Sequence, residues 1–253
     1  MAIAFVRSAS VATGASATTQ AVAFSGNITS GNLIVVVTAW FSASITVTSV
    51  TDTASNTYVA ASSVSANSNG SIQIWYAKNI VGGGTAPTVT VNYSASVADR
   101  SLVILEYSGA NATAPLDQSA IDTYASGGLT PDVGPVTTTD DGELIVAGEW
   151  MTNDPGSATV APGSGYTERV DISGIGSSGF PFEVEDQVQA TAGSISADWV
   201  MTPPNVSDGI MAMATFLKAP TGVITPTVGA ETVAGTSSVL NRGLLTRTAL
   251  KGT

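Results

Sequence analysis

Two short acidic clusters carry the residue types that could bind a cation or catalyse hydrolysis. In the first, Asp140, Asp141 and Glu143 surround Gly142 in TDDGEL. Clustered carboxylates on a loop are typical calcium ligands. The same spacing also fits a solvated hairpin turn, for which Asp-Gly is a favoured dipeptide. The similar segment ITSGNL at 28–33 lacks the acids, so we expect a turn here and no bound metal.

The second cluster is Glu183, Glu185 and Asp186 in FEVEDQV. In a strand, Glu183 and Glu185 would share one face, and Phe182 and Val184 would share the other. Paired carboxylates serve glycosidases when they are held across a cleft. Two acids on one strand indicate instead a solvated sheet face, so we expect no catalytic residues and a protein that is not an enzyme.

The composition narrows the chemistry further. The 253-residue chain has no histidine and no cysteine, which removes the commonest general base, the thiolate metal ligands and any disulfide. We therefore expect no cofactor and no metal. The net charge of −11 argues against nucleic-acid binding, and no apolar stretch approaches ~18 residues, so no membrane span is expected. Arg7 interrupts a short apolar start, which predicts no export signal.

The four tryptophans could form a platform on which sugar rings stack. Trp40 and Trp150 end the two most apolar segments and occupy similar places in an internal repeat, which predicts that both lie in the core. Trp75 and Trp199 have no such counterparts, so they are the candidates for stacking on a glycan.

An internal repeat must position all these residues. GNLIVVVTAW at 31–40 is echoed by GELIVAGEW at 142–150, and the echo continues in step to the end of FLKA at 216–219. The offset stays between 108 and 111 residues at four landmark pairs: Gly31 and Gly142, Trp40 and Trp150, Tyr58 and Tyr166, and Asp99 and Asp208. The repeat predicts one fold of about 110 residues used twice.

Each repeat reads as eight short strands separated by turns rich in Gly, Asn, Ser and Asp. The predicted strands are 3–8, 20–25, 32–40, 45–51, 56–64, 71–79, 87–94, 100–108, 117–124, 133–139, 143–150, 157–161, 166–172, 180–189, 195–201 and 209–217. This pattern predicts an all-β protein with two tandem antiparallel β-sandwich domains, jelly-roll-like, at 1–110 and 111–219.

The last segment, 220–253, differs in composition and predicts an extended C-terminal docking arm. It holds three of the eight basic residues and one acid, which gives it a charge of +2 against −13 for the rest of the chain. Its leucines have no sandwich of their own in which to be buried. The residues expected to dock on a partner are Leu240, Arg242, Leu244, Leu245, Arg247 and Leu250.

Several motifs of the first repeat resemble a known β-sandwich module: GNLIVVVTAW, SVTDTASNTYVAAS, IQIWYAKNIVGGGTAPTVTVNYS and LVILEYSGANATAPLD. That module recurs in virion proteins of tailed phages and in bacterial extracellular proteins. The resemblance covers residues 30–120 well and the second repeat loosely. It implies a fold and implies no active site.

Together these observations predict a non-enzymatic structural protein of a phage virion, such as a head decoration, head-fibre or tail-associated protein. Its expected partners are other virion proteins and copies of itself, and its expected location is the extracellular particle. Two alternatives stay open. One is a glycan-binding module for host attachment, and the other is a self-assembling surface-layer or filament subunit.

Overall fold

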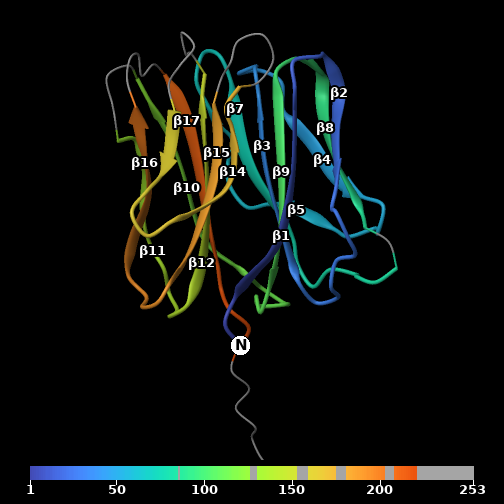
Figure 1. Ribbon diagram of the computed structural model, residues 1–253, viewed down its shortest axis with the longest axis vertical. Coiled ribbons are helices and arrows are strands. Elements are labelled where there is room, and N and C mark those ends of the chain that lie inside the picture. Colours follow the sequence, from blue (N-terminus) through green and yellow to red (C-terminus); the bar gives the residue numbers. More distant parts are fainter. Residues whose placement is uncertain (85, 126–129, 153–158, 175–180, 203–207, 221–253) are drawn as a thin grey trace, which may run out of the picture. The chain divides into compact units, whose positions relative to one another are not determined.

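The computed structural model describes residues 1–220, apart from residue 85 and the segments 126–129, 153–158, 175–180 and 203–207. This described part is made of antiparallel strands and turns and contains no helix (Figure 1). It accordingly holds no helix long and apolar enough to cross a bilayer. The all-β prediction is confirmed.

Each of the sixteen predicted strands overlaps an observed one, and among the described residues only the two-residue β6 was not anticipated. The first repeat contains β1 (Ala4–Thr13), β2 (Ala17–Ala23), β3 (Leu33–Trp40), β4 (Val47–Asp52), β5 (Tyr58–Ala60), β6 (Ser65–Ala66), β7 (Ser71–Ala77), β8 (Thr88–Val97) and β9 (Arg100–Ser108). The second contains β10 (Leu116–Tyr124), β11 (Asp132–Thr137), β12 (Glu143–Met151), β13 (Thr159–Pro162), β14 (Thr167–Ile172), β15 (Phe182–Gln189), β16 (Ser194–Thr202) and β17 (Gly209–Phe216).

The two repeats have the same strand order. A large sheet runs β1-β9-β3-β7-β5 in the first and β10-β17-β12-β15-β14 in the second. A three-stranded sheet runs β2-β8-β4 in the first and β11-β16-β13 in the second. In both repeats the chain alternates between its two sheets at nearly every connection, as in a double-sheet jelly roll. The prediction of two tandem sandwiches related by a repeat is therefore confirmed.

The two large sheets pack face to face, which makes four layers with three hydrophobic cores. One core fills the first sandwich, one fills the second, and the third lies between the large sheets and draws residues from both repeats. The central strands β3, β12 and β17 are consequently buried along their whole length. This explains their continuous apolar runs, because a strand covered on both faces needs no polar alternation.

The register of the central strands corrects one detail of the predicted repeat. Gly31 and Gly142 both have positive φ, 86° and 78°, and each precedes a central strand. Counting from them, the offset stays at 111 through β3 and β12. Trp40 therefore corresponds to Met151, and Trp150 to Ala39. Both tryptophans are fully buried, but Trp40 lies inside the first sandwich and Trp150 lies between the large sheets.

Contacts between the two sandwiches occur in exchanged pairs. Tyr107 and Phe216 hold corresponding positions, because they pair with the corresponding residues Leu33 and Leu144; Tyr76 and Asp186 correspond in the same way through Val35 and Val146. The Tyr107 hydroxyl donates to Asp186 Oδ2 at 2.5 Å, and the rings of Tyr76 and Phe216 meet at 5.5 Å. Such exchange is the signature of an isologous, two-fold contact.

The closest approach of the large sheets involves Gly148 and its counterpart Val37. A Cβ on Gly148 would lie 2.7 Å from Val37 Cγ1 and 3.3 Å from Ile72 Cδ1. We expect Gly148→Ala to lower the free energy of unfolding by about 1–3 kcal/mol through overpacking. Denaturant titration of the variant measures this loss. Adding Val37→Ala should restore part of it, and a Gly148→Ala protein as stable as the wild type would contradict the close approach.

The ends of the two repeats also meet. After β9 and β17 the chain forms a bridge between Ala110 and Lys218, and the amide of Ala219 donates to the carbonyl of Gly109 at 2.7 Å. Residues 1–221 accordingly form one compact unit. The predicted arm at 220–253 lies, apart from Pro220, outside the described residues.

Candidate functional site

The acidic turn at 140–143 is held together by its own backbone. Glu143 is fully buried, and its Oε1 accepts hydrogen bonds from the amides of Thr139 and Asp140, both at 2.8 Å. Asp141 Oδ1 accepts from the amide of Ala192 at 2.8 Å. No group of three or more metal-ligating side chains is placed to hold an ion within the described residues. The geometry matches the turn that the Asp-Gly pair predicts.

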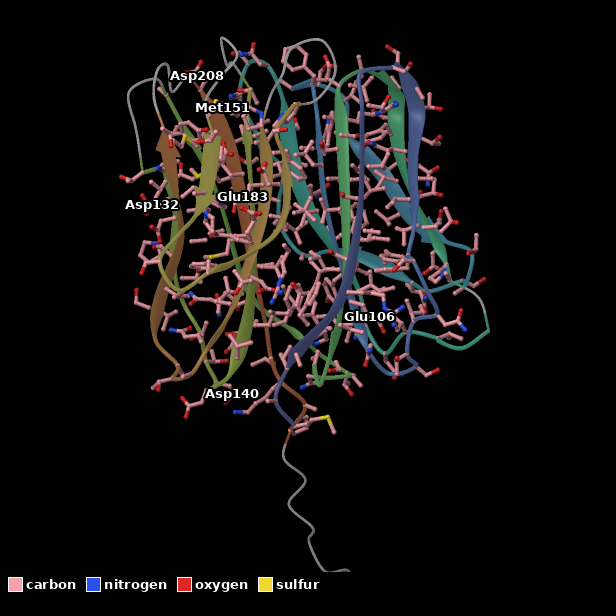
Figure 2. The ribbon with its side chains drawn as sticks, viewed as in Figure 1. Glu106, Asp132, Asp140, Met151, Glu183 and Asp208 are labelled. Atoms are coloured by element: carbon pink, nitrogen blue, oxygen red, sulfur yellow. The ribbon has the colours of Figure 1, made fainter. Side chains whose placement is uncertain are left out.

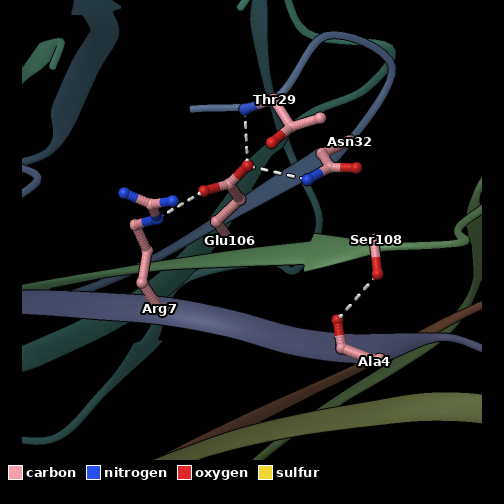
Figure 3. Close-up of polar contacts among 6 residues, drawn as sticks. All are labelled: Ala4, Arg7, Thr29, Asn32, Glu106 and Ser108. Atoms are coloured by element: carbon pink, nitrogen blue, oxygen red, sulfur yellow. Dashed lines mark hydrogen bonds and ion pairs between the residues drawn. The ribbon is translucent and has the colours of Figure 1, made fainter. Parts of the chain in front are cut away.

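The first sandwich stabilises the corresponding loop with Glu106, a residue that the sequence analysis did not single out (Figure 3). Its Oε1 accepts from the Thr29 amide and from Asn32 Nδ2, both at 2.7 Å, and its Oε2 forms an ion pair with Arg7 Nε at 2.9 Å. Asn32 corresponds to Glu143. Both repeats thus place a buried carboxylate beneath this loop, but they supply it from different strands.

The second acidic cluster is arranged differently from the prediction. Glu183 and Glu185 do share one face of β15, as predicted, but that face is not solvated, and both residues are fully buried. They lie inside the second sandwich, where the sheet β11-β16-β13 covers them (Figure 2 labels Glu183). The prediction missed this because the four-residue pattern FEVE does not reveal a second covering layer.

A third buried acid, Glu149, lies directly opposite Glu183 in the ladder between β12 and β15. Its Oε1 accepts a short hydrogen bond from the hydroxyl of Tyr124. Glu185 Oε2 accepts from the amide of Gly163 at 2.9 Å. Neither carboxyl oxygen of Glu183 has a hydrogen-bond partner among the described residues. We call Glu149, Glu183 and Glu185 the internal carboxyl cluster.

Burial controls the protonation of this cluster. It raises the pKa of Glu183 to about 8, with further contributions from the charges of Glu168 and Asp171. It raises the pKa of Glu185 to about 9 and that of Glu149 well above its ordinary value. Neighbouring like charges oppose ionisation further. At neutral pH the cluster therefore consists of protonated carboxyl groups, which can donate as well as accept hydrogen bonds.

The first sandwich has neutral residues at the corresponding positions. Thr38 corresponds to Glu149, Gln73 to Glu183 and Trp75 to Glu185, because the paired positions in the β3–β7 and β12–β15 ladders match. The Thr38 hydroxyl donates to the carbonyl of Ser101 at 3.0 Å, and Trp75 Nε1 donates to Gln73 Oε1 at 2.9 Å. The internal carboxyl cluster thus distinguishes the second sandwich. An alignment at offset 111, placing Glu149 against Thr38 in a buried strand, is the sequence signal that finds it.

The tryptophans predicted to stack on a glycan both face sandwich interiors. Trp199 is fully buried in the core of the second sandwich, so it offers no ring face to a ligand, and the stacking role predicted for it is not kept. Trp75 is partly buried against the core of the first sandwich. Both rings pack as core residues because β7 and β16 turn these positions toward the opposite sheet.

A polar cluster joins the two sandwiches around Asp186, on the face of β15 opposite to Glu183. Asp186 Oδ2 accepts from Tyr107 in the first sandwich and pairs with Arg169 Nε at 2.7 Å. The Arg169 guanidinium lies 4.0 Å from the ring centre of Phe5, which also belongs to the first sandwich. A charge buried here is tolerated because it is both paired and hydrogen-bonded.

Removing the Tyr107 hydroxyl tests this polar cluster. We expect Tyr107→Phe to lower the free energy of unfolding by about 1–3 kcal/mol, because a hydrogen bond to a buried charge is lost. Tyr76→Phe is the matched control, since it removes a hydroxyl from the same interface without disturbing Asp186. Equal effects of the two changes in chemical denaturation would show that the bond to Asp186 contributes nothing.

Two adjacent pockets occupy the end of the compact unit from which residue 220 leads on to the C-terminal segment. An apolar pocket of about 340 Å³ is lined by Met1, Ala2, Gly142, Val188 and Lys218. A polar pocket of about 490 Å³ is lined by Asn111, Thr139, Asp140, Asp141, Lys218 and Pro220. We call these residues the terminal face. Figure 2 shows Asp140 at this end and Met151 and Asp208 at the opposite one.

The residues predicted to dock on a partner lie outside the described part of the chain. These are Leu240, Arg242, Leu244, Leu245, Arg247 and Leu250. The structure therefore brings none of them to the terminal face or to the internal carboxyl cluster.

No protein-family model, curated protein or solved structure matches this chain. The function has to be inferred from its own residues and geometry.

Proposed function

We propose that this chain is a non-enzymatic structural protein of a phage particle, a head decoration, head-fibre or tail-associated protein, whose C-terminal segment anchors it. The observation that carries the proposal is the shared core between the two large sheets. It joins two jelly rolls into one block of four layers, with a single hydrophobic core at its centre. A block of this kind suits a protein that has to hold a fixed shape on a surface.

The charge distribution supports anchoring by the C-terminal segment. Residues 220–253 carry +2 and the rest of the chain carries −13. Opposite charge draws such a segment to an acidic surface, and each leucine gains about 1.5–3 kcal/mol when it is fully buried there. Such an acidic surface can belong to another virion protein or to another copy of this chain.

Mass spectrometry and immunogold labelling of purified particles test the proposal. With an antibody raised against the full chain, we expect regular labelling of particles from the source strain and a constant copy number in each particle. Density-gradient fractions without particles are the control. A protein confined to those fractions would overturn the proposal, and binding of the full chain to a glycan array in its place would favour host attachment.

A further inference from the structure

The terminal face combines two surfaces that call for different side chains. Its apolar pocket leaves Val188 45% exposed, an unusual degree for a valine in a strand whose other apolar side chains, Phe182 and Val184, are buried. Its polar pocket presents the exposed carboxylates of Asp140 and Asp141. Lys218 lines both pockets, so they adjoin each other. A ligand that covers both needs an apolar group next to a cationic one.

The C-terminal segment has this pattern. In LNRGLLTR, Arg242 and Leu244 are two residues apart. Residues i and i+2 of an extended chain lie on the same side, about 7 Å from each other. One stretch of extended chain can therefore place a leucine in the apolar pocket and an arginine beside Asp140.

The segment is also long enough to reach another molecule. Thirty-two residues follow Thr221, from Gly222 to Thr253. An extended chain spans about 3.3 Å per residue, so Arg242 can lie up to roughly 70 Å from Thr221. The body of a neighbouring copy supplies both the apolar pocket and the negative charge.

We propose that the terminal face of one copy receives the C-terminal segment of a second copy, with Leu244 in the apolar pocket and Arg242 beside Asp140 and Asp141. This inference rests on the proposed function, because it names the surface on which the anchoring segment docks. A contact between a segment and a different surface of the next copy is heterologous. It builds a ring where the rotation closes and a filament where it does not.

Disulfide trapping in the full chain tests the proposal, because the natural sequence contains no cysteine. One preparation carries Val188→Cys and a second carries Leu244→Cys. After mixing under mild oxidation, we expect a crosslinked heterodimer on a non-reducing gel. The matched control replaces the first variant by Val200→Cys, since Val200 is 48% exposed but belongs to β16 and does not line either pocket. The Val188 mixture should give at least five times more heterodimer.

A charge reversal tests the arginine. Adding Asp140→Lys to the Val188→Cys chain should reduce the crosslink several-fold, whereas adding Asp132→Lys, an exposed acid on β11, should leave it unchanged. Equal yields from Val188→Cys and Val200→Cys would overturn the docking surface. So would a crosslink that forms only within a chain carrying both Val188→Cys and Leu244→Cys. Either result leaves the proposed function intact if the protein is still found in particles.

Discussion

Replacing Glu183 by glutamine is expected to stabilise the protein in alkaline solution and to leave its stability in acid almost unchanged. Glu183 is fully buried, lacks a hydrogen-bond partner among the described residues and has a pKa of about 8 in the folded state. In the unfolded chain its pKa returns to about 4.5. The folded state therefore binds more protons between these two values. Its stability falls as the pH rises from about 4.5 to about 8, and then levels off.

The size of the gain follows from the shift. One pKa unit corresponds to about 1.4 kcal/mol, so the full loss is on the order of a few kcal/mol. Glutamine has nearly the same shape and cannot ionise, so Glu183→Gln removes this loss. At this chain length each kcal/mol moves the thermal midpoint by about 2–4 °C. We expect a rise of several degrees at pH 9 and almost none at pH 5, measured by circular dichroism during heating.

The control is Asp132→Asn, which removes an exposed carboxylate from β11 and should move the midpoint little at either pH. The double variant Glu149→Gln with Glu183→Gln should flatten the pH dependence further, because Glu149 also has a raised pKa. A Glu183→Gln midpoint that tracks the wild type from pH 5 to pH 9 would mean that Glu183 ionises in the folded state without cost.

Deleting residues 220–253 is expected to abolish assembly and to leave the sandwiches folded. The three cores draw only on residues before Ala219, so the truncated chain should keep its strand signal and its thermal midpoint. The deleted segment contains every predicted docking residue, and the leucines among them each contribute about 1.5–3 kcal/mol when buried in a partner. Incorporation into particles, and any self-association measured by sedimentation, should be lost.

A weaker change separates the sequence of the segment from its length. Replacing Leu244 and Leu245 by serine keeps all 34 residues and should reduce incorporation nearly as much as the deletion. If the truncated chain assembled with an unchanged copy number, the segment would be only a terminus and the anchor would lie in the sandwiches.

Much of the fold could be read from the sequence because its signals are local. Gly31 and Gly142 mark equivalent turns, and the apolar runs that follow them predict strands covered on both faces. The offset along those strands was harder to fix, since Trp40 and Trp150 attract an alignment that is wrong by one residue. A one-residue shift moves a side chain to the opposite face of a strand. For this reason Trp150 was placed correctly in the core but assigned to the wrong layer.

The candidate site was harder to predict because its character depends on long-range burial. Glu183 and Glu185 have the alternation of a wet strand face, and only the sheet that covers them makes them internal. Glu106 is a single acid within an apolar run, and its partners Thr29 and Asn32 are more than 70 residues away. Alternation along a strand shows which side chains share a face. It does not show what covers that face.

The exchanged contacts between the sandwiches have a consequence for how the two halves can differ. A dimer of identical chains receives every substitution twice, once on each side of its axis, and it separates on dilution. Here both halves lie on one chain, so the contact keeps a high effective concentration and does not depend on protein concentration. A residue such as Glu185 can be placed in one half while the other keeps Trp75. The covalent link thus allows a nearly symmetric scaffold to carry an asymmetric charge.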